Sequence, residues 1–127
     1  MGLPRTAVAS FRLALLAAFV VVMHLATTTL MYPLLETLGD KANHFAAFLV
    51  LAFLADFSFP HSRFGLPKVL ALLSYGLFIE AIQYFLPYRS FSPLDLAADG
   101  IGIAVYRLSL PALMHAPFLR RRWTREA

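Results

Sequence analysis

The sequence contains no cysteine, which excludes disulfide scaffolds, thiolate metal centres and a cysteine nucleophile. Charged residues are scarce: they make up 14% of the 127 residues, against roughly 25% in soluble domains. Apolar residues reach 60%, so a globule of this size could not cover itself with polar surface. The chain also lacks internal repeats and low-complexity linkers, and its length suits a single domain. These deficits exclude an ordinary soluble enzyme and indicate an integral membrane protein.

Four apolar stretches approach the roughly 20 residues that a helix needs to cross a membrane. They cover about residues 11–31, 41–59, 67–86 and 94–113, and a basic tail follows at 115–127. The sequence therefore predicts an all-α fold, a bundle of four transmembrane helices in one domain over residues 1–127. The first stretch is longer than a usual signal core and no clean cleavage site follows it, so we expect an uncleaved helix. Gly100 and Gly102 predict close contact with a neighbouring helix.

Basic residues set the expected orientation of these helices. Nine of the eleven lysines and arginines lie before or at the start of the first stretch, between the second and third or at the start of the third, in the second half of the fourth, or after it. Because such residues favour the cytoplasmic side, both termini should be cytoplasmic. The basic residues are not interleaved along a polar face, which argues against a nucleic-acid partner. The aromatic and basic tail indicates either an interfacial anchor on anionic lipid or a solvated basic end.

The acidic residues lie mostly on the expected outer side of the membrane, and the preference of basic residues for the cytoplasmic side does not explain this. Five of the seven fall on the expected outer side: Glu36, Asp40, Glu80, Asp95 and Asp99. Three helices each carry a polar pair three or four residues apart: Asp40 with His44, Glu80 with Gln83, and Asp95 with Asp99. Because this spacing puts both members of a pair on one helix face, the pairs predict one recessed polar site near the outer membrane surface.

Several of these residues also have purely structural explanations. Asp40 and Asp95 could cap helix N-termini, His44 could be a satisfied core histidine, and Arg89 could be a plain loop cation. Glu80 resists such an explanation, because it lies in an apolar stretch near a helix C-terminus. An unpaired carboxylate there costs at least about 2–3 kcal/mol. We therefore expect Glu80 to be either protonated or paired with Arg89, Lys41 or His44.

The polar residues stand in three blocks: Asp40-Lys41-x-x-His44-Phe45, Glu80-x-x-Gln83 and Arg89-Ser90-Phe91-Ser92-x-x-Asp95. In this order on successive helices, the blocks resemble the VanZ-like family of bacterial membrane proteins over about residues 40–102. Asp99 departs from the family, which usually has asparagine there. The resemblance implies a multi-pass protein of the bacterial cytoplasmic (inner) membrane. It also implies an association with resistance to glycopeptide antibiotics, particularly of the teicoplanin type. It does not imply any particular reaction.

We expect a site at the outer membrane face that binds or acts on an envelope lipid, a wall precursor or a lipoglycopeptide. The catalytic candidates are Glu80 and His44 as acid and base, with Asp95 orienting His44 or Arg89. The candidates for substrate binding are Arg89, Lys41, Gln83, Asp40 and Asp99. Membrane lipids are the expected partners, and the sequence leaves catalysis and the oligomeric state open.

Other functions compete with this one. A divalent metal could bind Asp40, His44, Glu80 and Asp95, but nearby basic residues argue against it, so we expect no metal and no cofactor. A hydrolase could use Ser90 or Ser92 with His44 and Asp95, although no nucleophile elbow surrounds either serine. The protein could also be a non-catalytic scaffold or sensor for envelope proteins, in which the polar cluster only fixes helix register. A transporter is disfavoured, because four helices leave little room for a pathway.

Overall fold

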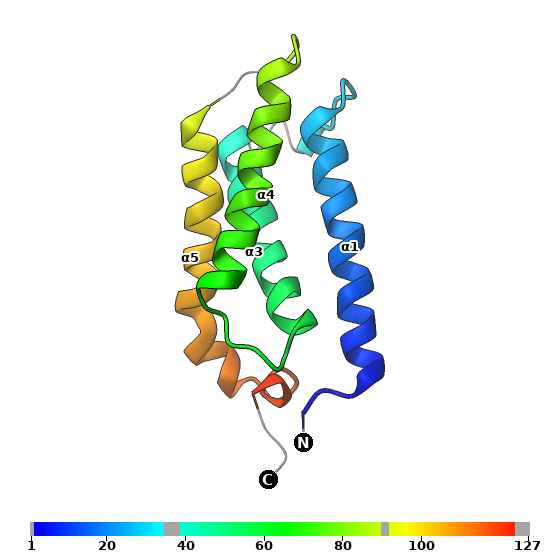
Figure 1. The fold of residues 1–127 in the computed structure, drawn as a ribbon, viewed down its shortest axis with the longest axis vertical. Coiled ribbons are helices and arrows are strands. Elements are labelled where there is room, and N and C mark those ends of the chain that lie inside the picture. Colours follow the sequence, from blue (N-terminus) through cyan, green and yellow to red (C-terminus); the bar gives the residue numbers. More distant parts are fainter. Residues whose placement is uncertain (1, 35–38, 90–91, 124–127) are drawn as a thin grey trace.

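The computed structural model describes residues 2–34, 39–89 and 92–123, so Glu36, Ser90 and Phe91 lie outside the described residues. The described residues form helices and no strand, which confirms the all-α prediction. The helices are α1 (Arg5–Thr27), α3 (Asp40–Ser58), α4 (Leu66–Phe85), α5 (Pro93–His115) and the short 3₁₀ helix η1 (Arg120–Arg122). The four α-helices form one bundle, and the start of α1 and η1 lie at the same end of it (Figure 1).

The first helix lies closer to the N-terminus than the predicted range 11–31. It begins at Arg5, directly after Pro4, and ends at Thr27. The prediction followed the apolar residues alone, whereas the helix also includes the polar turn around Arg5. It stops because Thr28 is extended, with φ −74° and ψ 150°, and successive β-branched threonines favour extended backbone.

Within the described residues three helices, α1, α4 and α5, are long and apolar enough to cross a membrane. The predicted span at 41–59 corresponds to α3, which is not one of these three because polar residues occupy both of its ends. The apolar stretch of α3 from Phe45 to Ala55 covers only about 16 Å, roughly half of a bilayer core of about 30 Å. This helix packs against α1, α4 and α5, and so lies at the centre of the bundle.

The distribution of side chains is the reverse of that in a soluble protein. Large apolar side chains such as Leu13 and Leu108 are 69% and 79% exposed, while the carboxylates of Asp56, Glu80 and Asp99 are fully buried. An apolar exterior of this extent is stable where lipid rather than water surrounds the helices. Together with the three apolar helices, it indicates a membrane protein.

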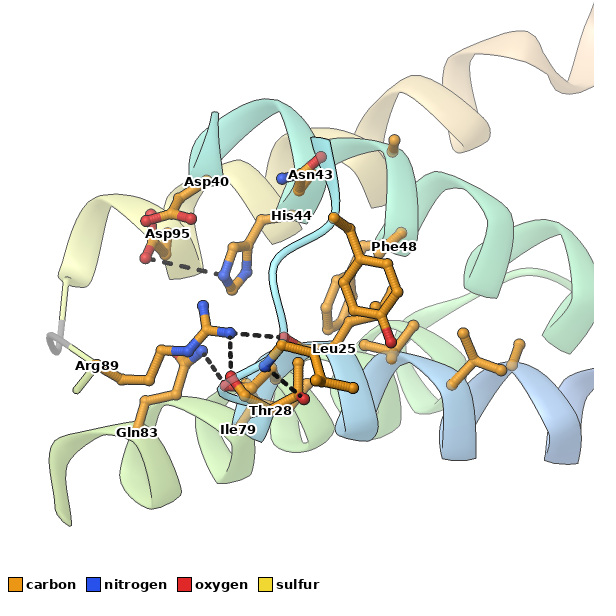
Figure 2. A pocket seen from close by; sticks show the side chains of 18 of the residues that line it. Leu25, Thr28, Asp40, Asn43, His44, Phe48, Ile79, Gln83, Arg89 and Asp95 are labelled. Atoms are coloured by element: carbon orange, nitrogen blue, oxygen red, sulfur yellow. Dashed lines mark hydrogen bonds and ion pairs between the residues drawn. The ribbon is translucent and has the colours of Figure 1, made fainter. Parts of the chain in front are cut away.

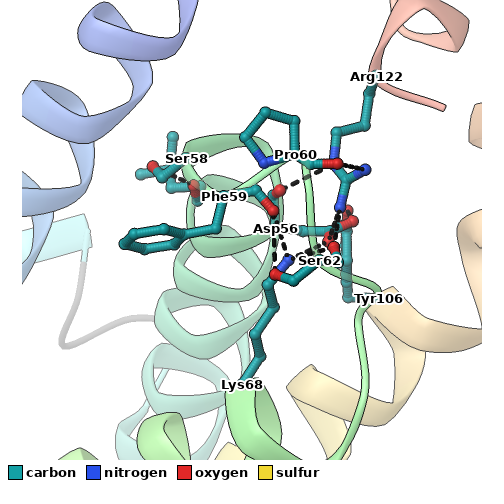
Figure 3. A network of polar contacts seen from close by, with 9 residues as sticks. Asp56, Ser58, Phe59, Pro60, Ser62, Lys68, Tyr106 and Arg122 are labelled. Atoms are coloured by element: carbon teal, nitrogen blue, oxygen red, sulfur yellow. Dashed lines mark hydrogen bonds and ion pairs between the residues drawn. The ribbon is translucent and has the colours of Figure 1, made fainter. Parts of the chain in front are cut away.

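The end of the bundle that holds η1 is closed by a buried polar network around Asp56 (Figure 3). Asp56 Oδ1 accepts hydrogen bonds from Lys68 Nζ at 2.9 Å and Arg122 Nη2 at 2.7 Å, and its Oδ2 accepts one from the Tyr106 hydroxyl at 2.7 Å. Arg122 also donates to three backbone carbonyl oxygens of α3 and the following loop. Arg122 is therefore neither a lipid anchor nor a solvated cation, and it fastens the basic tail to the bundle.

The contact between α3 and α5 depends on a glycine. A methyl group at Gly102 would lie 2.5 Å from the carbonyl oxygen of Phe45, so only glycine allows this approach. A methyl group at Gly100 would meet only Leu73 Cδ2, at 3.9 Å, which is ordinary contact. The prediction of a close helix contact is confirmed for Gly102 and wrong for Gly100.

Substituting each glycine by alanine tests this difference on one helix. We expect Gly102→Ala to lower the unfolding free energy by about 1–3 kcal/mol, because α3 and α5 must move apart to make room. Gly100→Ala is the matched control and should be neutral, or more stable by up to about 1 kcal/mol through helix propensity. Thermal unfolding followed by circular dichroism in one detergent measures both. Equal midpoints for the two variants would contradict the assigned contact.

Candidate functional site

His44 of α3 lies at the point where α4 and α5 bring their carboxylates together. Its Nδ1 is hydrogen-bonded to Asp99 Oδ1 at 2.6 Å. Its Nε2 lies 3.8 Å from Glu80 Oε1 and 3.8 Å from Asp95 Oδ2. The three polar helix faces expected from the sequence therefore meet around one imidazole ring, which we call the His44 cluster: His44, Glu80, Asp95 and Asp99.

The carboxylates of this cluster are deeply buried. Glu80 and Asp99 have no exposed surface, and Asp95 is 5% exposed. Glu80 Oε2 accepts a hydrogen bond from the backbone N–H of Ser92, the N-cap residue of α5, at 3.1 Å. The Ser92 side chain makes no capping hydrogen bond, so its backbone joins α5 to the carboxylate of α4 instead.

Asp99 orients the His44 ring through this hydrogen bond, whereas the sequence led us to expect Asp95 in that role. The close approach of α4 at Gly76 leaves the room that Asp99 needs, because a methyl group there would lie 2.6 Å from Asp99 Oδ2. A carboxylate on Nδ1 fixes the orientation of an imidazole and directs its Nε2. Asp99 therefore puts a carboxyl group directly on the histidine.

Two predicted binding residues contact α1 rather than the carboxylates. Arg89 Nη2 donates to the carbonyl oxygens of Leu25 and Thr28, at 3.0 and 2.9 Å. Gln83 Nε2 donates to the carbonyl oxygen of Ala26, at 2.9 Å. The last carbonyls of a helix have no partner within it, so these side chains complete the end of α1. The sequence could not predict that Arg89 and Gln83 complete the end of α1. Their acceptors are backbone carbonyls, which every residue carries, so no residue pattern marks them.

The remaining cation of the region lies at the surface. Lys41 Nζ is 3.9 Å from Asp95 Oδ1, and its side chain is 60% exposed. Asp40, beside it, is also exposed and lines the pocket described next. Both residues are therefore placed where a ligand could meet them, whereas Glu80 and Asp99 are fully buried.

A pocket of about 760 Å³ opens beside the His44 cluster, between α1 and α3. Its polar end is formed by Asp40, Asn43, His44, Gln83, Arg89 and Asp95. Its remaining wall is largely apolar and comes mainly from residues 18–31, in α1 and the segment that follows it, and from α3 residues between Ala46 and Leu51. Figure 2 shows His44 and Asp95 facing Arg89 and Gln83 across this polar end.

The arrangement does not support a serine nucleophile. The His44 ring is hydrogen-bonded to Asp99, and among the described residues it makes no hydrogen bond to Ser92. Ser90, the other serine considered, lies outside the described residues. What the geometry offers is a histidine with one nitrogen fixed and the other nitrogen beside two carboxylates, at the edge of an amphipathic pocket.

Comparison with known proteins identifies the family. The model of the family described as VanZ/LLP1 matches residues 4–113. Searches of curated proteins and of solved structures found no match. Because the family match includes all four α-helices almost completely, the chain belongs to the VanZ/LLP1 family.

The position of Arg89 predicts that it stabilises the end of α1. Arg89→Gln should lower the unfolding free energy by about 1.5–3 kcal/mol, since a charged donor to two partly buried carbonyls is lost. Lys41→Gln, which removes an exposed cation at the same end, should change it by less than about 1 kcal/mol. Thermal midpoints of both variants, with protease sensitivity after Thr27, check the assignment. A midpoint for Arg89→Gln as high as that of Lys41→Gln would contradict it.

Proposed function

We propose that this VanZ/LLP1 family protein binds a lipid of the cell envelope and acts on its polar head at the His44 cluster. In this proposal the protein lies in the bacterial cytoplasmic membrane with both termini cytoplasmic, and the pocket opens near the outer face. Family membership suggests a link to glycopeptide resistance. A change in envelope lipids or in lipid-linked wall precursors at that face would alter how a lipid-bearing drug such as teicoplanin engages the cell surface.

The observation that carries the proposal is the amphipathic pocket beside the cluster. One end is polar, while its α1 wall from Ala18 to Ala26 extends about 12 Å along the helix and is almost entirely apolar. A water-soluble substrate would gain nothing from this apolar part. A lipid would place its acyl or prenyl chain against α1 and α3 and its head against His44 and Asp95.

The polar end contains groups suited to an anionic head. The hydrogen bonds of Arg89 to Leu25 and Thr28 both use Nη2, and its other nitrogens make no hydrogen bond to the described residues, so their N–H groups could bind a ligand. Lys41 is exposed at the same end and adds a second cation. Phosphate is the anionic group that envelope lipids and lipid-linked wall precursors share, and guanidinium groups bind it with directed hydrogen bonds.

The cluster also contains groups suited to moving a proton. His44 Nε2 lies beside the carboxylates of Glu80 and Asp95, while Asp99 fixes the opposite ring nitrogen. An imidazole oriented in this way can accept a proton from a bound hydroxyl or donate one to a leaving oxygen. Glu80 would then set the charge around Nε2 from a position that solvent does not reach.

Positive charge at the opposite end of the bundle supports the orientation. Arg5, Lys68 and the arginines of η1 lie at the end far from the His44 cluster. Such residues favour the cytoplasmic side. The pocket would therefore open toward the outer leaflet, where wall precursors and glycopeptides meet the membrane.

Removing the buried carboxylate tests the proposal in cells. Wild type and Glu80→Gln are expressed at matched membrane levels in a susceptible Gram-positive host, and teicoplanin and vancomycin are titrated separately. We expect wild type to raise tolerance mainly to teicoplanin and Glu80→Gln to abolish the effect. Ser74→Ala, an exposed change on the same helix, is the control and should behave as wild type. Full tolerance with Glu80→Gln would overturn the proposed role, and a Glu80→Gln variant that cannot be brought to the wild-type membrane level would favour the scaffold alternative.

Blocking the apolar part of the pocket tests lipid binding directly. Ala47→Trp adds an indole inside the pocket, whereas Leu108→Trp adds the same group to a 79% exposed position outside it. We expect Ala47→Trp to retain at least about tenfold less lipid, as judged by native mass spectrometry of protein extracted from membranes. Leu108→Trp should retain the wild-type amount. Equal lipid retention by the two variants would contradict the assignment of the pocket.

A further inference from the structure

Three potential metal ligands converge inside the His44 cluster. His44, Glu80 and Asp95 each offer one ligand atom, and these atoms all lie within 4.8 Å of one another. His44 Nε2 is 3.8 Å from an oxygen of each carboxylate. Neighbouring ligands of one first-row ion, with bonds to nitrogen and oxygen of about 2.0–2.2 Å, lie roughly 3.0–3.5 Å apart, so the three groups would have to draw in by less than about 1.5 Å to bind one ion.

The opposite side of the imidazole is arranged as in a metal-bound histidine. Metal-ligating histidines donate their other ring N–H to a carboxylate or carbonyl, which fixes the ring and presents a lone pair to the ion. His44 Nδ1 makes this bond to Asp99 Oδ1 at 2.6 Å. When Nδ1 carries the proton, Nε2 directs its lone pair toward Glu80 and Asp95, and a cation between them relieves the repulsion.

An unsatisfied oxygen provides independent evidence that the cluster receives a ligand. Glu80 is fully buried, and its Oε1, the oxygen nearest His44 Nε2, has no hydrogen-bond partner among the described residues. The other oxygen of Glu80 is satisfied by the N–H of Ser92, so the side chain is held with one oxygen aimed into the cluster. Leaving a buried carboxylate oxygen without a partner is costly, and metal coordination is one of the few ways to satisfy it.

Nearby basic residues argue against a metal ion in the sequence, but in the folded protein they leave the cluster largely unneutralised. Arg89 is bonded to carbonyl oxygens of α1, and no ion pair between it and the cluster exists among the described residues. Lys41 is 60% exposed, and among the described residues its ion pair is with Asp95, at 3.9 Å. Three buried carboxylates therefore surround one imidazole, and within the described part of the chain Lys41 is the cation that pairs with one of them, a charge balance that a divalent ion would improve.

We infer that His44, Glu80 and Asp95 bind one divalent metal ion, with Asp99 as the positioning residue behind His44. One imidazole and two carboxylates suit Mn²⁺ or Zn²⁺. His44 and Asp95 also line the pocket, so the open coordination positions would face it and accept a phosphate oxygen. The inference deepens the proposed function and rests on it only for the identity of that phosphate-bearing ligand.

Metal binding can be measured on the purified full-length protein without any substrate. The protein is extracted in detergent without chelator and analysed for metal, then stripped and titrated with Mn²⁺, Zn²⁺ and Co²⁺. We expect wild type to bind about one ion per chain with a rise in its thermal midpoint. The visible absorption of bound Co²⁺ reports nitrogen and oxygen ligation. Glu80→Gln and Asp95→Asn should lose this binding.

Two further variants keep the test interpretable if a ligand variant fails to fold. Asp99→Asn retains all three ligands and the shape of the side chain, and it should weaken affinity by about 10- to 100-fold. Ser74→Ala, an exposed change on α4 away from the cluster and the pocket, should keep wild-type affinity. No binding by wild type, or equal affinity in Asp99→Asn and Ser74→Ala, would overturn the metal site.

The metal experiment and the lipid experiment can reject the ion site and the lipid-binding proposal independently of each other. Lipid retention by Ala47→Trp and Leu108→Trp is measured on protein stripped of metal, so it reports the pocket alone. Metal binding together with equal lipid retention in those variants would reject the proposed function and keep the ion site. Lipid binding without metal would reject the ion site and leave His44 as an acid–base residue.

Discussion

The hydrogen bond between His44 and Asp99 connects the central helix α3 to α5, and the polar site depends on it. This bond requires two close approaches of the backbone. Gly102 lets α5 reach the carbonyl oxygen of Phe45, and Gly76 lets α4 approach Asp99 Oδ2. Because both glycines lack a side chain, the ring of His44 is enclosed by α4 and α5 and held at a fixed orientation. Glu80 then approaches the ring from α4, with its Oε1 3.8 Å from His44 Nε2.

The two ends of α3 explain how a small bundle combines stability with an open pocket. At one end, Asp56 satisfies Lys68, Tyr106 and Arg122 together and closes the bundle. At the other end, the carboxylates around His44 are only partly satisfied by the protein, and the pocket lies beside them. Removing a charge from the closed end leaves its partners buried and unpaired, which is strongly destabilising. The unsatisfied groups at the open end are instead available for a ligand.

Much of the site could be predicted from spacing and charge alone. Pairs of polar residues three or four positions apart indicated that Glu80, Asp95 and His44 face one another, and the structure brings them within 3.8 Å of the imidazole nitrogen. The partner of Arg89 could not be predicted, because its acceptors are backbone carbonyls of α1. The burial of Arg122 was missed for a similar reason, since its partner Asp56 is distant in sequence.

The sequence by itself determined that the protein is helical, apolar on its surface and a member of one membrane-protein family. These properties follow from composition and from short-range periodicity, which each segment carries alone. Only the tertiary structure decided that Asp99 rather than Asp95 holds His44, and that Arg89 completes α1 rather than pairing with Glu80. Those choices depend on the register and separation of packed helices, where one missing methyl group at Gly76 or Gly102 decides which side chains can meet.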